Sequence, residues 1–200
     1  MTSTKENQIA RAALAEFALR GYEGTTTKRI AKLSHVSEGS IFRIFESKEK
    51  LFQRCVELSH YENQSSGDFA KELLSNDFRR AVMNAVHVIL TNVGRDHVRL
   101  MFYGLLERPS AVRDALVDVE ASRHLLANRI EQERSAGGIR TDVDSSRAAE
   151  FLLDSIASFQ VRRAVEKQSK TSRHAVRLYV DLWCSALTPE SHLKGRKHSR

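Results

Sequence analysis

Four polar side chains in the first quarter of the chain have the chemistry to bind an anionic partner. Lys28, Arg29, Ser40 and Arg43 are expected to face outward from two neighbouring short helices. Cationic groups gathered on one face of a domain favour nucleic acid as the partner. The types and positions of these residues therefore predict a nucleic-acid-binding surface.

The charge of the chain favours the same class of partner. Its net charge is +7, and that charge is unevenly distributed. Residues 1–50 contain 9 Lys/Arg against 6 Asp/Glu, and residues 190–200 contain 4 against 1, whereas residues 51–189 are nearly balanced at 19 against 18. The positive ends indicate an anionic partner, with nucleic acid as the leading candidate.

Three short helices are expected to hold these side chains in place. Gly21 ends the first helix, and Thr26 and Ser37 are natural N-caps for the second and third. A turn of three to four residues between the last two gives the geometry of a helix-turn-helix. The apolar residues expected to form its core are Ile9, Ala13, Phe17, Ile30, Ala31, Val36, Ile41 and Phe45.

The rest of the chain also has a helical pattern. It contains only 2 Pro and 9 Gly, which favours an all-α protein over one with many strands. The polar residues 62–68 are expected to form a linker or loop. Apolar periodicity and capping residues predict further helices over 78–93, 96–107, 110–136, 144–168 and 172–187.

The N-terminal sequence resembles the DNA-binding signature of the TetR family over about 45 residues. The resemblance implies an all-α chain with a helix-turn-helix domain at 1–50 and a helical ligand-binding and dimerisation domain at 51–189. The residues that carry it are Ala12, Ala13, Phe17, Gly21, Tyr22, Thr25, Thr26, Ile30, Ala31, Val36, Ser37, Gly39, Phe45, Ser47, Lys48, Glu49 and Leu51. The basic composition of residues 190–200 predicts a disordered tail.

The resemblance also implies which residues contact DNA. Residues 38–45 would be the recognition helix, with Arg43 placed for a bidentate contact with guanine. The family often has tyrosine at the position of Phe42, so one phosphate contact is lost there, although Phe42 can pack against a sugar or a thymine methyl. The DNA-contacting residues expected are Thr26, Thr27, Lys28, Arg29, Ser37, Glu38, Gly39, Ser40, Phe42, Arg43 and Lys48.

In this family the C-terminal helices form a dimer and enclose a ligand cavity. The last two helices would pair with those of a second copy in a four-helix bundle, through Leu152, Ile156, Phe159, Leu178, Tyr179, Leu182 and Trp183. An apolar or aromatic effector would have His87 or Tyr103 at its polar end, in a cavity lined by Met83, His87, Phe102, Tyr103, Leu126 and Phe159. For each of these residues, ordinary intrachain core is the alternative.

The predicted function is that of a homodimeric repressor that binds a palindromic operator and is released by a small-molecule effector. The alternatives are a ligand-independent or architectural DNA-binding protein and a helical enzyme. No phosphate-binding glycine loop, metal-ligand spacing or nucleophile motif is present, so we expect no catalytic residue, metal or cofactor.

The expected location is a reducing cytoplasm, without a membrane partner. Cys55 and Cys184 fit no metal or redox spacing. Residues 1–7 lack the apolar stretch of a signal peptide, and the apolar stretch 81–94 is too short and too polar to span a bilayer.

Overall fold

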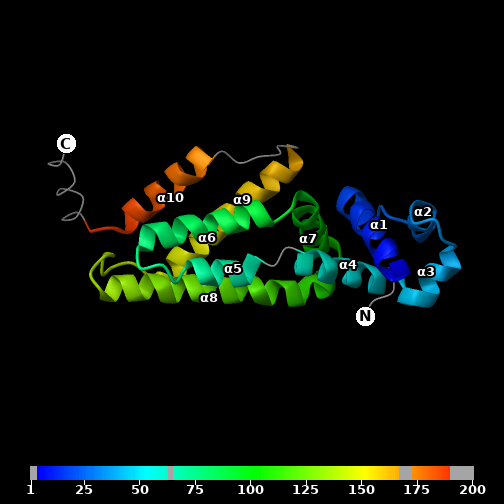
Figure 1. Cartoon of the computed structure of the whole chain (residues 1–200), viewed down its shortest axis with the longest axis horizontal. Helices are drawn as coiled ribbons and strands as arrows, with labels where there is room; N and C mark the ends of the chain where they lie inside the picture. The colour runs from blue at the N-terminus through cyan, green and yellow to red at the C-terminus, as the bar shows by residue number, and fades with distance from the viewer. Residues whose placement is uncertain (1–3, 63–64, 167–172, 190–200) are drawn as a thin grey trace. The chain divides into compact units, whose positions relative to one another are not determined.

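The computed structural model describes residues 4–62, 65–166 and 173–189, and every regular element in these ranges is a helix (Figure 1). The all-α prediction is confirmed. None of these helices combines the length and the apolar character that crossing a bilayer requires. The elements are α1 (Thr4–Arg20), α2 (Thr27–Leu33), α3 (Glu38–Phe45), α4 (Lys48–Glu62), α5 (Ser65–Glu72), α6 (Phe78–Asn92), α7 (Arg95–Glu107), η1 (Pro109–Val112), α8 (Arg113–Ser135), α9 (Ser145–Val165) and α10 (Arg173–Leu187).

The chain divides into two compact units, each with its own apolar core. The first unit combines Met1–Gln64 with Val93–Val117, and the second combines Ser65–Asn92 with Asp118–Arg200. The compact unit around α1, α2 and α3 is therefore larger than the 1–50 segment assigned to DNA binding, and that functional boundary stays a prediction. The tail assigned to 190–200 lies outside the described residues.

An aromatic cluster ties α1 to α4 in the first unit. The Phe17 ring meets the Phe52 ring edge-on, with centroids 5.0 Å apart, and Tyr22 meets Phe52 in the same way at 5.4 Å. Phe17 and Phe52 are completely buried. Gly21 ends α1 with a positive φ of 75°, and this left-handed turn brings Tyr22 back onto the cluster.

The structure corrects the expected helix over 110–136. Pro109–Val112 forms the short 3₁₀ turn η1, and the α-helix begins only at Arg113. The turn directs Val112, which is fully buried, against Gly104 on α7. A methyl group on Gly104 would overlap Val112, so the close contact between α7 and η1 depends on the missing side chain.

The predicted linker over 62–68 is also wrong in part, because α5 begins at Ser65. The first turn of α5 is polar, and for this reason the sequence analysis assigned it to a linker or loop. Phe69 and Leu73, four residues apart, are buried in the core of the second unit and supply the burial that stabilises α5.

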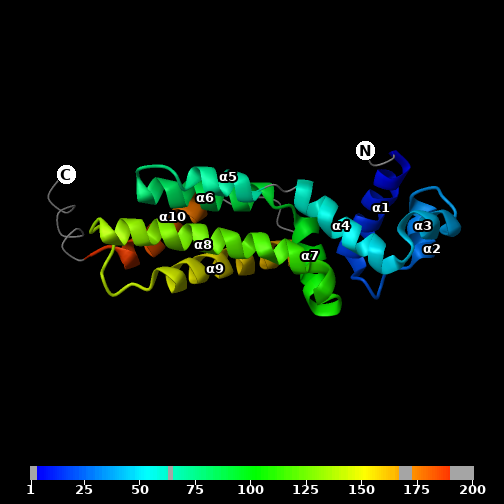
Figure 2. The ribbon, with the colours of Figure 1, turned by 90° about the horizontal axis from the view of Figure 1, so that it is seen from below.

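Ion pairs and a shared core join the helices of the second unit. Arg79 on α6 pairs with Asp181 on α10 at 2.6 Å, and Arg123 on α8 pairs with Asp154 on α9 at the same distance. In Figure 2, α8 lies alongside α9, as the second of these pairs requires. The core between the helices includes fully buried Val82, Leu126 and Ile130.

We expect the protein to lose stability as the pH falls from about 6.5 toward 4. Burial between α4 and α7, together with the charge of nearby His60, lowers the pKa of His97 to about 4, although a hydrogen bond to the backbone of Ser59 opposes the shift. Between these pH values the unfolded chain binds a proton that folded His97 does not, so unfolding is favoured by up to roughly 3 kcal/mol.

Urea unfolding at pH 7.5 and pH 5 would measure this loss. Replacing His97 with glutamine, which keeps a hydrogen-bonding side chain near Ser59, should flatten the pH dependence. If the stability of His97→Gln depended on pH as strongly as that of the unaltered protein, the loss of stability would have to come from other groups.

Candidate nucleic-acid interface

Helix α3 is fixed at both ends by local hydrogen bonds. The Ser37 hydroxyl accepts from the backbone N–H of Ser40 at 3.2 Å, which confirms Ser37 as the N-cap. At the other end Glu46 has a positive φ of 64°, and its N–H donates to the carbonyl of Phe42. Ile41 and Phe45 are buried beneath the helix, so the opposite side of α3 is left for solvent or a partner.

Helix α2 is anchored in a similar way. The Thr26 hydroxyl accepts from the N–H of Arg29 at 3.3 Å, confirming the predicted N-cap. After α2, Gln8 of α1 donates its side-chain amide to the carbonyl of Ser34 at 3.1 Å. This bond fastens the turn between α2 and α3 to the first helix, as a rigid helix-turn-helix requires.

Thr27 and Glu38 link the two helices of the motif directly. The Thr27 hydroxyl, in the first turn of α2, donates to the carboxylate of Glu38 at the start of α3. Glu38 was predicted to contact DNA, but here its carboxylate is engaged within the protein. Through this hydrogen bond Glu38 links α3 to α2.

Arg29 is held by a residue that the sequence analysis missed. The carboxylate of Glu16 on α1 is buried and lies 2.6 Å from Nε of Arg29 and 3.1 Å from Nε of Arg20. About half of the Arg29 side chain remains exposed. The four-residue spacing of Glu16 and Arg20 indicates an ion pair between these two residues on one helix. Nothing in the sequence indicates that Glu16 also pairs with Arg29.

Lys28 and Arg43 are the predicted cations that remain available. Both side chains are exposed, and no carboxylate pairs with either in the part of the chain that the structure describes. Phe42, on the same helix as Arg43, is 44% exposed although it is apolar. An unpaired guanidinium beside an exposed ring suits contact with base edges and sugars.

Lys48 is partly engaged inside the first unit. Its ammonium lies 4.2 Å from the centre of the Tyr22 ring, and the guanidinium of Arg108 lies 4.1 Å from the same centre. Partial burial is the main reason that the pKa of Lys48 is lowered, and the charge of Arg108 acts in the same direction. Lys48 therefore helps to fix the start of α4, and its contact with phosphate stays a prediction.

Gly39 is open to the outside of the molecule. It lies in the first turn of α3 without a positive φ, and a methyl group placed on it would meet nothing within 4 Å. The fold itself therefore does not require glycine at this position. The absence of a side chain leaves room for something that approaches α3 from outside.

We expect Gly39→Ala to stabilise the protein while weakening DNA binding. Alanine favours the helix over glycine by about 0.5–1 kcal/mol, whereas its methyl group would hold the α3 backbone away from DNA. Thermal unfolding and DNA titrations would measure the two effects. Gly67→Ala on α5 is the matched control, since Gly67 is equally open and should affect only stability. Undiminished DNA affinity in Gly39→Ala would contradict close approach at this residue.

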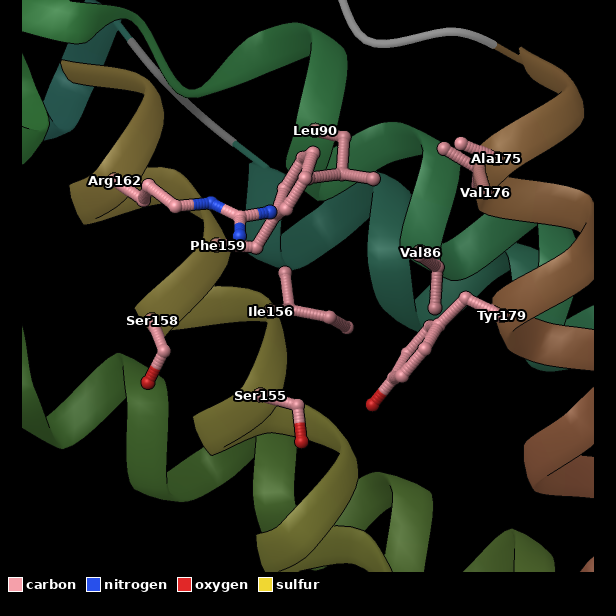
Figure 3. A pocket seen from close by; sticks show the side chains of 10 residues that line it. All are labelled: Val86, Leu90, Ser155, Ile156, Ser158, Phe159, Arg162, Ala175, Val176 and Tyr179. Carbon is pink, nitrogen blue, oxygen red and sulfur yellow. The ribbon is translucent and has the colours of Figure 1, made fainter. Parts of the chain in front are cut away.

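The second unit contains a cavity of about 610 Å³ between α6, α9 and α10 (Figure 3). Its apolar wall includes Leu90 and Phe159, and its polar groups include Arg162 and Tyr179. The full lining consists of Val86, Leu90, Ser155, Ile156, Ser158, Phe159, Arg162, Ala175, Val176 and Tyr179.

Only one residue of the predicted effector site, Phe159, lines this cavity. Leu126 is buried in the core of the second unit, and Met83 and His87 are half-buried on α6 outside the lining. Phe102 and Tyr103 lie on α7 in the first unit, where Tyr103 is close to Gly21. The six-residue effector site therefore stays a prediction. Helical spacing alone does not show which face of α6 meets α9 and α10.

The residues predicted to form a dimer interface fall into three groups. Leu152 and Ile156 are buried in the core of their own chain, and half-buried Trp183 stacks on Phe78. Leu178 and Leu182 are instead 53% and 64% exposed on α10. Tyr179 and Phe159 belong to the cavity lining.

Comparison with known proteins agrees with this geometry. Residues 9–55 match the model of the family described as bacterial regulatory proteins, tetR family. An uncharacterized HTH-type transcriptional regulator of Bacillus subtilis, YvkB, is 38% identical over 73 residues, which are 34% of this chain and 38% of YvkB. The chain spans less than half the length of the curated relatives it matches.

Solved structures extend the likeness of fold to most of the chain. A TetR-family regulator from Rhodococcus RHA1 superposes with a TM-score of 0.71 at 23% identity, covering 94% of this chain and 98% of that protein. PfmR, a TetR-family regulator from Thermus thermophilus, superposes with a TM-score of 0.70 at 20% identity, covering 92% of this chain and 97% of PfmR.

A helix-turn-helix with outward-facing cations, followed by a helical domain, is the architecture of DNA-binding transcription regulators. Residues 9–55 belong to the TetR family of bacterial regulatory proteins, and the fold seen in members of that family extends over most of the chain.

Proposed function

We propose that the protein is a homodimeric repressor that binds a palindromic operator through α3 and is released by a small-molecule effector. The observation that carries the proposal is the unpaired, exposed Arg43 on a helix that Ser37, Ile41 and Phe45 hold rigidly. A fixed arginine of this kind can read guanine in the major groove.

Pairing of two chains is supported by exposed apolar side chains on α9 and α10. Phe151 on α9 is 64% exposed, and Leu178 and Leu182 on α10 are similarly uncovered. Large apolar groups at this exposure favour burial against a partner. Two recognition helices about one turn of DNA (~34 Å) apart would then read the two halves of a palindrome.

Release by an effector is supported by the cavity in the second unit. A space of about 610 Å³ with apolar walls and a few polar groups has the size and composition of small-molecule sites. A ligand that binds one conformer of the dimer better than another would shift the separation of the recognition helices. Catalysis is not part of the proposal, since the functional groups on α2 and α3 are suited to binding.

Selection of DNA fragments by the purified full chain would test the proposal. The expected result is an enriched palindrome, a footprint for at least one dimer, and release of the protein by a compound that occupies the cavity. DNA binding that no cavity ligand changes would favour the ligand-independent alternative. Absence of any preferred sequence would refute operator binding.

A further inference from the structure

The cavity in the second unit contains a single cation among otherwise apolar and hydroxyl-bearing residues. Arg162 on α9 lies at its rim, and no aspartate or glutamate occurs among the lining residues. Within the described ranges, no carboxylate pairs with the Arg162 guanidinium. An arginine beside an apolar cavity without an acidic partner is available to a negatively charged ligand.

The side chain of Arg162 is held against an apolar wall. Its guanidinium carbon lies 5.4 Å from the centre of the Phe159 ring, and Figure 3 shows the side chain running alongside that ring. Contact with the ring orients the guanidinium and lowers the entropy lost when an anion binds. The neighbouring Arg163 is committed elsewhere, since it donates to the carbonyl of Leu90 at 3.3 Å.

Hydroxyl groups complete the polar part of the cavity. Figure 3 shows the Tyr179 hydroxyl of α10 directed into the space between α9 and α10, on the same side as the Ser155 hydroxyl of α9. Ser155 itself donates to the carbonyl of Phe151, which leaves its oxygen lone pairs as acceptors. Leu90, Ile156 and Val176 supply the apolar surface that a hydrocarbon group would cover.

We propose that the cavity binds an apolar carboxylate, with its carboxylate on Arg162 and its hydrocarbon part against Leu90, Ile156 and Phe159. One guanidinium matches one negative charge and can bind a carboxylate through two parallel hydrogen bonds. The inference rests on the proposed function in one respect, because it names the chemical class of the effector. The previously expected anchors, His87 and Tyr103, have no part in it.

Calorimetric titration without DNA tests this assignment, using decanoate, 1-decanol and decylamine as probes. The full chain should bind decanoate more tightly than the alcohol or the amine. Arg162→Gln should weaken decanoate binding by about 10- to 100-fold, since a charge-assisted contact is lost, and should change binding of 1-decanol by less than about threefold. Arg147→Gln, on the exposed side of the same helix, is the matched control.

Arg162 also lies in the last turn of α9, where a positive charge stabilises a helix end. A purely structural role would weaken decanoate and 1-decanol equally, and that result would overturn the assignment. Failure of the unaltered protein to bind decanoate would overturn it as well. Binding that depends on Arg162 but leaves the operator complex intact would support the carboxylate site and contradict the proposed release by an effector.

Discussion

Replacing Arg43 with alanine is expected to abolish specific operator binding while leaving the fold and the dimer unchanged. A bidentate arginine–guanine contact contributes about 1–3 kcal/mol, and a symmetric dimer would lose it twice. The expected loss of affinity for the selected operator is therefore roughly 30-fold to 10⁴-fold. Arg43 makes no ion pair within the described structure, so its removal breaks no intramolecular ion pair.

Competition titrations with operator and scrambled DNA would separate specific from general binding. Arg43→Ala should bind the two duplexes nearly equally at moderate salt. Arg140→Ala, which removes an exposed arginine from the second unit, serves as the control and should keep the preference for the operator. Retention of the preference by Arg43→Ala would exclude base reading by this residue.

Replacing Leu182 with arginine is expected to separate the two subunits and thereby remove operator binding. Leu182 is 64% exposed on α10, so arginine fits the folded single chain, but a charge buried between subunits would cost several kcal/mol. With one recognition helix per molecule, affinity should fall at least as far as in Arg43→Ala. Sedimentation and operator titration would measure the two effects.

Leu74→Arg provides a matched control for the dimer experiment. Leu74 is 80% exposed and lies two residues after the end of α5, far from α9 and α10 in the sequence. This variant should stay dimeric and bind the operator normally. A dimeric Leu182→Arg protein with full affinity would show that α10 does not form the subunit interface.

The helix-turn-helix was predictable because its determinants are local. Thr26 and Ser37 are N-caps in the structure as expected, since a capping side chain acts only on the turn that follows it. The apolar spacing also placed Ile30 and Ile41 in the core, where both are fully buried. Caps and periodicity therefore located α3 without tertiary information, whereas its role as the recognition helix came from the family resemblance and stays a prediction.

The ion pairs and the cavity were not predictable, because they join residues that are distant in sequence. The ion pair between Glu16 and Arg29 joins α1 to α2, and the cavity is lined both by Tyr179 from α10 and by Leu90 from α6. The spacing of apolar residues identifies the apolar face of each helix, but it does not show which helix packs against that face. Tyr179 was assigned to the subunit interface for this reason, although it lines a space within its own chain.

The core of the first unit is completed by residues far along the chain. Leu100 and Val112 are fully buried in the same cluster as Phe17, Ile30 and Phe52. A fragment that ends after α4 would expose to water the apolar surface that Leu100 and Val112 cover, and it would lose several kcal/mol of stabilisation. The helix-turn-helix segment is consequently not a transferable domain by itself. Fused to another protein without residues 93–117, it would fold incompletely.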